Sequence, residues 1–282
     1  MTRWTTAVRL GVERGGIEVR HAFTSGQELW NNFFWPVLML LVLVFMRGST
    51  VPGTDVDLTV MVLPGIVGVF IAMAMLNLAG PISLDREDGT LLRAKATPRG
   101  MVGYLVGRIL KVAVLTLAGL LAFLVPGVML VEGLRVGDPS AWLHLLAVFT
   151  LGMVAVLPLG AVVGALFANP RNLFVVYMPM MALIAVSGIF YPITELPAWL
   201  QGVAQVFPVY WLGLGVRAAL LPDQMAAAEI GGSWRQLEMV GVLGVWAAVG
   251  LVLAPILMRR MVRGESGARV AARKQQALQG WV

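Results

Sequence analysis

Seven stretches of this chain contain no Asp, Glu, Lys or Arg over 18 residues or more. About 20 apolar residues are needed for a helix to cross the hydrocarbon core of a bilayer, so these stretches have the length of membrane helices. A helix satisfies its own backbone hydrogen bonds inside lipid, which irregular chain cannot do. We therefore predict an all-α integral membrane protein with six transmembrane helices, at Leu29–Met46, Leu58–Leu84, Val112–Val131, Pro139–Pro170, Asn172–Thr194 and Met239–Met258.

The composition supports this class and excludes several functions. Hydrophobic residues make up 59% and charged residues 13% of the chain, whereas soluble domains carry about 25% charged residues. The absence of cysteine excludes disulfides, thiolate metal sites and cysteine nucleophiles. No ionisable residue lies deep in a predicted span, which argues against a proton-coupled antiporter and against a hydrolase within the membrane. We expect neither a catalytic residue nor a metal site in this chain.

The seventh charge-free stretch, Leu196–Val216, is predicted not to cross the membrane. It contains Pro197 and Pro208, and proline inside a helix removes a hydrogen bond at a cost of about 3 kcal/mol. We predict an external re-entrant helical hairpin over residues 191–222, between the fifth and sixth spans. Six spans place 17 of the 21 Lys and Arg residues on the side of the two termini. Because positive loops stay in the cytoplasm, both termini are expected there, as in a multi-pass protein of a bacterial inner membrane.

The two ends of the chain are basic and flank a single six-helix transmembrane domain, residues 29–258. Residues 1–28 are predicted to form an amphipathic connecting helix in the inner membrane interface, although Gly15 and Gly16 weaken it. The alternative is an ordinary basic tail that only sets the topology. Residues 259–282 are predicted to be a basic cytoplasmic tail in contact with anionic lipid. The acidic residues before the first apolar run indicate that the first helix is retained and not cleaved as a signal peptide.

The cytoplasmic connection between the second and third spans, residues 85–98, has the form of a docking element. Three acids precede Gly89, two leucines lie beside basic residues, and Thr97-Pro98 ends the short helical run. Such an amphipathic helix could place its leucines in a groove of a soluble partner and its acids against arginines. The alternative is a solvated turn helix that only connects two spans.

A second unusual segment follows the fifth predicted span on the external side. Together with the cytoplasmic connection, it makes the chain resemble the membrane subunits of ATP-binding-cassette exporters of the daunorubicin/doxorubicin-resistance and polysaccharide-export class. The family's external pattern, a Gly-x-x-x-Pro followed by Leu-Pro-x-Trp-Leu, a proline and an arginine, is present as Gly188, Pro192, Leu196, Pro197, Trp199, Leu200, Pro208 and Arg217. Its cytoplasmic acid–Gly–Thr…Thr-Pro pattern is present as Glu87, Gly89, Thr90, Thr97 and Pro98.

The resemblance implies a half-transporter that has no ATPase domain of its own. Two permease copies, expected to be identical, would form the substrate path, and two separate ATPase subunits would bind ATP and Mg. This chain contains no Gly-x-x-x-x-Gly-Lys-Ser/Thr phosphate-binding loop, so it is not expected to be an enzyme. Its expected partners are the ATPase, the second copy and lipid, and no nucleic acid. The residues expected to couple to the ATPase are Asp85, Glu87, Asp88, Gly89, Thr90, Leu91, Leu92, Arg93, Thr97 and Pro98.

In such a half-transporter the second and fifth spans would line the path. Their methionines suit a bulky amphiphile, because methionine is flexible, polarizable and common at promiscuous binding surfaces; the alternative is ordinary packing. The predicted lining residues are Met73, Asn77, Tyr177, Met178, Met181 and Phe190. We expect efflux of a drug-like or lipid-like molecule. The alternatives are export of a cell-surface polysaccharide or glycolipid by the same mechanism, and a membrane scaffold or sensor that transports nothing.

Overall fold

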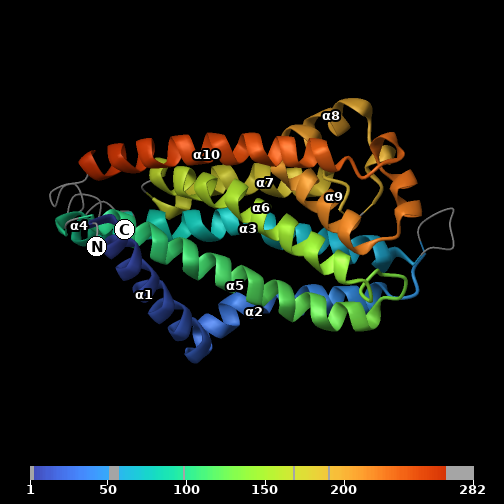
Figure 1. Cartoon of the computed structure of the whole chain (residues 1–282), viewed down its shortest axis with the longest axis horizontal. Coiled ribbons are helices and arrows are strands. Elements are labelled where there is room, and N and C mark those ends of the chain that lie inside the picture. The colour runs from blue at the N-terminus through green and yellow to red at the C-terminus, as the bar shows by residue number, and fades with distance from the viewer. Residues whose placement is uncertain (1–2, 51–56, 98, 168, 190, 265–282) are drawn as a thin grey trace, which may run out of the picture.

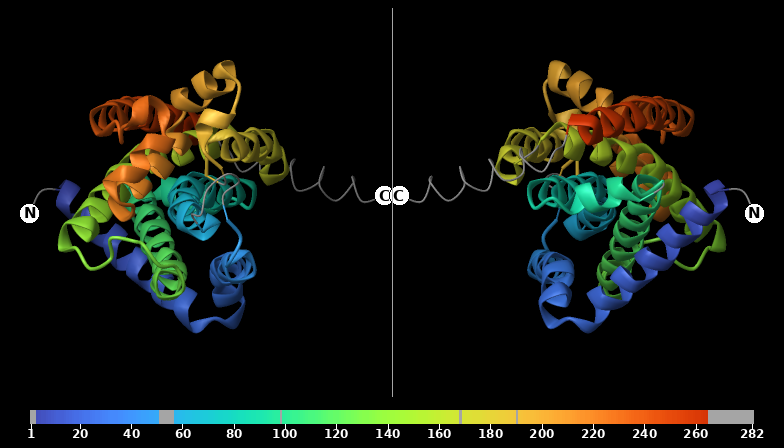
Figure 2. Two further views of the ribbon diagram at one scale, coloured as in Figure 1. Left: turned by 90° about the vertical axis from the view of Figure 1, so that its right-hand side faces the viewer. Right: turned by 90° about the vertical axis from the view of Figure 1, so that its left-hand side faces the viewer.

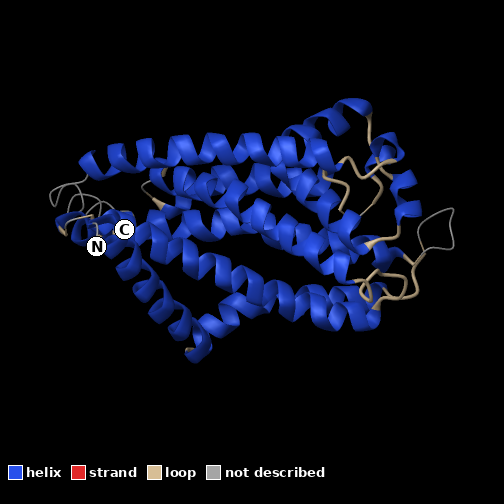
Figure 3. Cartoon of the chain, viewed as in Figure 1, coloured by secondary structure: helices blue, strands red, loops and turns tan. Residues whose placement is uncertain are grey.

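The structure, a computed structural model, describes residues 3–50, 57–97, 99–167, 169–189 and 191–264. Within these ranges all the long elements are helices, as Figure 3 shows. This confirms the predicted all-α membrane fold. The longer helices are α1 (Arg3–Thr24), α2 (Gly26–Met46), α3 (Leu58–Glu87), α5 (Gly100–Leu130), α6 (Pro139–Leu166), α7 (Phe174–Val186), α9 (Pro208–Leu220) and α10 (Gln236–Gly264), and α4 (Thr90–Ala96) and α8 (Ala198–Val206) are short.

Helix α3 forms the centre of the bundle. It is apolar on all sides, which is the pattern of a helix surrounded by other helices, and most of its residues are buried. Helices α5, α6 and α9 pack around it, as the end views in Figure 2 show. Gly160 and Gly164 let α6 approach closely, because a Cβ at these positions would lie 2.4 Å from the Met75 carbonyl oxygen and 2.9 Å from that of Ala79. Small residues of this kind are what allows helix backbones to pack closely in membranes.

The two ends of the bundle carry different structures. At one end, which we call the α4 end, lie α4, the start of α1 and the last turn of α10 (Figure 1), and α4 contacts α10 there. At the other end, the hairpin end, α8 and α9 are followed by two 3₁₀ helices, η3 (Asp223–Ala228) and η4 (Ile230–Gly232), before α10 returns. The cytoplasmic connection predicted at 85–98 and the hairpin therefore lie at opposite ends of the bundle.

Among the described residues, five helices are long and apolar enough to cross a membrane, namely α2, α3, α5, α6 and α10. The predicted fifth span, Asn172–Thr194, is much shorter than expected: it consists of η1 (Pro170–Leu173) and the 13-residue α7. Gly188 ends this segment with a φ of +69°, a left-handed conformation that glycine adopts without strain. The segment still joins the two ends, because Phe167 before it accepts a hydrogen bond from Ser83 near the α4 end, and Gly188 after it accepts one from Arg217 at the hairpin end.

Two helix boundaries also differ from the sequence prediction. Helix α5 begins at Gly100 and not at Val112, so Arg108 and Lys111 lie on the helix itself. The charges are tolerated because both have acidic partners on other helices, Asp85 and Glu18 for Arg108 and Glu28 for Lys111. Helix α3 likewise continues to Glu87, which places the first acids of the docking segment on its last turn.

The hairpin consists of two short helices that meet at an angle of 90° around Phe207. Helix α8 keeps an exposed side, whereas all 13 residues of α9 are buried among α3, α6 and α10. Pro208 occupies the first turn of α9, where proline costs no hydrogen bond. After α9 the chain stays at the hairpin end, where η3 and η4 precede α10.

Helix α1 packs along α5 and does not stand alone as an interfacial helix. It turns Ala7, Gly11, Gly15 and Ala22 toward the bundle. Gly15, which was expected only to weaken the helix, therefore allows close packing against α5. Three apolar side chains of α1, those of Val8, Val12 and Phe23, remain exposed, which leaves them available to lipid. The predicted tail, residues 259–282, is described only to Gly264.

Candidate functional site

The turn from α3 into α4 is fixed by local hydrogen bonds. Gly89 has a φ of +83°, the left-handed conformation that lets the chain change direction between the two helices. The Asp88 carboxylate accepts a hydrogen bond from the Thr90 backbone N–H at 2.7 Å, and the Thr97 hydroxyl donates to the Ala94 carbonyl at 3.0 Å. The segment is therefore a short helix with defined ends. Pro98, which was predicted to stop it, lies outside the described residues.

Helix α4 has an inner and an outer side. Leu91 is only 2% exposed and belongs to the core of the chain, whereas Leu92 is half-buried. The prediction that both leucines contact a partner is therefore wrong for Leu91, which anchors α4 to its own bundle. Asp88, Arg93 and Thr97 are exposed, and Glu87 is half-buried. The outer side thus presents an acid before Gly89 and basic residues after it.

Asp85 was also predicted to contact a partner, and this prediction is wrong for a physical reason. Its carboxylate is buried and accepts hydrogen bonds from the Tyr104 hydroxyl and from the Arg108 guanidinium, each at 2.6 Å. A buried charge needs such partners, since an unpaired one is costly. Sequence reasoning missed Tyr104 and Arg108 because both lie on α5, about 20 residues further along the chain.

At the hairpin end the predicted motif residues form a real cluster around Arg217. This side chain is 1% exposed, and its Nε lies 2.6 Å from a carboxylate oxygen of Glu229, which is 4% exposed. Its Nη1 donates to the carbonyl oxygen of Gly188 at 3.3 Å. The structure thus brings Gly188 and Arg217 together from either side of the hairpin. Glu229 follows the hairpin in the sequence, and no local pattern indicated it as the partner.

The prolines and the tryptophan of the same motif define helix ends and a surface. Pro192 immediately precedes the 3₁₀ helix η2 (Ile193–Glu195), and Pro197 immediately precedes α8. Trp199 on α8 is 69% exposed. Tryptophan has an apolar body and a polar N–H, which is why it is enriched where membrane meets water. Pro192, Pro197 and Pro208 therefore build the hairpin, and Trp199 forms its outer face.

The predicted path residues lie on the outer surface of the single chain. On α3, Asn77 is exposed and Met73 is half-buried, although most of that helix is buried. On α7, Tyr177, Met178 and Met181 are exposed. Helices α3 and α7 lie on the same side of the molecule (Figure 2). Phe190 lies outside the described residues. The five described residues, Met73, Asn77, Tyr177, Met178 and Met181, are thus exposed or half-buried in the single chain, and we call them the outward-facing strip.

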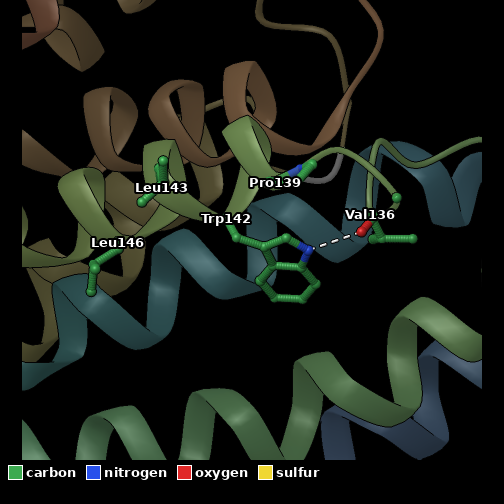
Figure 4. Close-up of a pocket in the computed structure, with 6 residues that line it drawn as sticks. Val136, Pro139, Trp142, Leu143 and Leu146 are labelled. Carbon is green, nitrogen blue, oxygen red and sulfur yellow. Dashed lines mark hydrogen bonds between the residues drawn. The ribbon is translucent and has the colours of Figure 1, made fainter.

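A hollow opens at the hairpin end, and none of the predicted site residues lines it. Figure 4 shows it beside the first turns of α6, where the Trp142 indole N–H donates to the Val136 carbonyl oxygen at 2.9 Å. Its volume is about 550 Å³ and its walls are almost wholly apolar, formed by Val136, Gly137, Pro139, Trp142, Leu143 and Leu146. The hollow has no charged group that could orient a polar ligand.

Taken together, a bundle of membrane helices with a docking-type helix at one end and a buried hairpin at the other defines an integral membrane permease. The model of the family described as ABC-2 family transporter protein matches residues 48–254, and the chain belongs to this family. No curated protein matches the chain in a sequence search. The chain is therefore a multi-pass membrane subunit of an ATP-binding-cassette exporter, a transport component that works with ATPase subunits.

Proposed function

We propose that two copies of this chain form the pathway through which an exporter moves a drug-like or lipid-like amphiphile out of a bacterial cell. Two separate ATPase subunits, which bind ATP and Mg, would dock at the α4 end and drive the movement. Both termini would lie in the cytoplasm with α4. The observation that carries the proposal is α4 itself, a helix anchored by Leu91 whose outer side is left exposed.

The exposed side of α4 offers a surface of mixed charge to a soluble partner. Glu87 and Asp88 stand before the turn, and Arg93 and Lys95 stand on the helix. An ATPase groove with basic groups at one end and acidic groups at the other would complement this order, and such complementarity selects a partner and its orientation. Leu92 and Thr97 are available for the apolar and neutral contacts between these charges. Asp85 and Leu91 act in this proposal only as supports.

The outward-facing strip on α3 and α7 supports a second copy as the other wall of the path. Asn77 on α3 and Tyr177 on α7 are the polar groups of the proposed lining, and Met73, Met178 and Met181 are its flexible apolar groups. Methionine surfaces adapt to ligands of different shape. A strip of this composition favours an amphiphile over a hydrated polysaccharide, whose many hydroxyl groups would lack partners among methionines.

The test is charge reversal at the α4 end, with a matched reversal at the hairpin end. The wild-type chain, Glu87→Lys and Glu132→Lys are each reconstituted with the partner ATPase in vesicles, and dye efflux and ATP hydrolysis are measured. Glu132 is exposed between α5 and α6 at the hairpin end, so it provides the same charge change far from α4.

We expect Glu87→Lys to lose ATP-driven efflux while the protein remains in the membrane, and Glu132→Lys to behave as the wild type. Full efflux and normal ATPase assembly in Glu87→Lys would refute docking through this residue. Efflux of a glycolipid but not of dyes would instead favour the glycan alternative, and a wild-type complex that moves neither would favour a scaffold.

A further inference from the structure

A cluster of charged side chains joins three helices just beneath the α4 turn. It consists of Glu18 on α1, Asp85 on α3, and Tyr104 and Arg108 on α5, and we call it the three-helix cluster. Arg108 lies 2.6 Å from Asp85 and 3.1 Å from Glu18, so one guanidinium bridges α3 and α1. Tyr104 donates to the same Asp85 oxygen at 2.6 Å.

A second arginine completes the cluster from the α1 side. Arg14 pairs with Glu18 at 2.9 Å, so two acids and two arginines alternate and their formal charges cancel. Both guanidinium groups lie over the Tyr104 ring, at 5.4 Å for Arg14 and 5.7 Å for Arg108, within the range of cation–π attraction. Because each buried charge depends on its neighbours, removing one member weakens the others.

The backbones of α1 and α5 are in contact beside this cluster. A Cβ on Gly11 would lie 2.7 Å from the Gly103 carbonyl oxygen, and one on Gly15 would lie 3.0 Å from that of Gly107. The spacing of four residues repeats on both helices, so the contact follows a full turn. The glycines hold α1 against α5, and the charged cluster then joins this pair to α3.

The position of Asp85 allows the cluster to respond to movement of α4. Asp85 lies one helical turn before the Asp88–Gly89 turn that leads into α4, and Leu91 fixes α4 to the same end of the bundle. Any displacement of α4 therefore reaches Asp85 within one turn of rigid helix. From Asp85 it can pass through Arg108 to α5 and through Glu18 to α1.

We propose that the three-helix cluster makes α1 move with the α4 turn, so that Glu18 and Arg108 are positioning residues for the coupling of ATP hydrolysis to transport. This inference rests on the proposed function for its coupling role, but the mechanical link is a property of the chain alone. Neither residue touches substrate or nucleotide in this account. Their role is to carry the movement of the docking helix to the helix that leads into the first span.

The first experiment measures the link in the permease without any ATPase. Because the chain contains no cysteine, Val12→Cys on α1 and Ala96→Cys on α4, both exposed, can carry two spin labels in lipid nanodiscs. Glu18→Ala removes the carboxylate that Arg108 binds. Glu13→Ala is the matched control, since Glu13 is an acid of the same helix whose one ion pair in the described structure is with Arg9, one turn away and exposed.

We expect Glu18→Ala to broaden the distribution of label-to-label distances by about twofold, because α1 is then free to open locally, and Glu13→Ala to leave it unchanged. An unchanged distribution in Glu18→Ala would show that the glycine contact alone holds α1, and it would overturn the proposal. This result decides the mechanical link even if no ATPase partner is ever found.

The second experiment measures coupling in the complete complex in vesicles, as the ratio of molecules moved to ATP hydrolysed. We expect Glu18→Ala to keep ATP hydrolysis and to lower this ratio by about fivefold, which is within the usual range for coupling residues, whereas Glu13→Ala keeps the wild-type ratio. Equal ratios in the two variants would overturn the coupling role. A wild-type complex without ATP-driven transport would refute both the proposed function and the coupling role. The link between α1 and α4 would then still be decided by the spin-label distances.

Discussion

Replacing the buried Arg217 with methionine is expected to destabilise the protein more than replacing any exposed arginine. Methionine fills a similar volume without charge, so Glu229 would remain buried and lose its cation at 2.6 Å. Breaking a buried pair in this way costs about 3–5 kcal/mol, because the remaining charge is uncompensated. The carbonyl oxygen of Gly188 would lose a donor as well, and this adds to the cost.

The assay is thermal unfolding of the purified protein in detergent, followed by tryptophan fluorescence. About 2–4 °C of midpoint shift per kcal/mol is usual for chains of 150–250 residues, so a fall of roughly 6 °C or more is expected. The matched control is Arg259→Met, an exposed arginine near the end of α10, which is expected to shift the midpoint little.

The double replacement Arg217→Met with Glu229→Leu separates charge from packing. Replacing both partners with apolar residues is often neutral or stabilising, so this variant is expected to recover most of the midpoint lost by Arg217→Met. Two results would show that the buried ion pair does not stabilise the hairpin. One is that Arg217→Met unfolds at the wild-type temperature, and the other is that the double replacement is less stable than the single one.

Two further predictions concern α1 and the start of α3. Gly15→Leu should lower stability by about 1–3 kcal/mol through overpacking against α5, whereas Gly16→Leu, with no neighbour within 4 Å of its Cβ, should be tolerated; equal midpoints would refute the close contact. Asp57→Ala should cost about 1 kcal/mol, because Asp57 caps α3 through the Thr59 N–H at 2.8 Å. The Thr59 hydroxyl also lowers the pKa of the Asp57 carboxyl, so its contribution should be present above the ordinary aspartate pKa of about 3.9 and vanish as the pH falls below it. If the stability difference between the wild type and Asp57→Ala grows as the pH falls, this prediction is contradicted.

The sequence predicted the architecture well because the membrane imposes simple rules. Charge-free length alone located the long helices, since lipid excludes charges and unpaired backbone. Two prolines predicted that 196–216 would not be a straight span, and Pro208 indeed begins a separate buried helix. A short helix was predicted from the acids, leucines and Thr97 between two spans, and it is present as α4.

Most of the failures come from pairing between residues that are distant in the sequence. Helix α5 begins 12 residues before the first charge-free residue of its span, because Arg108 and Lys111 are neutralised by acids on α1, α2 and α3. The same pairing withdraws Asp85 from the surface. Leu91 was assigned to a partner because a short amphipathic helix does not reveal which side its own protein covers. Glu229 could not be assigned to Arg217 from any local spacing.

The most direct test of the account is to ask which end of the bundle meets the ATPase in the native membrane. A photo-crosslinking amino acid is placed at position Thr97 on the α4 end, or at Trp199 on the hairpin end; both positions are exposed. We predict that the probe at Thr97 captures an ATP-binding protein and that the probe at Trp199 does not. Capture of the ATP-binding protein from Trp199, or from neither position, would contradict the account.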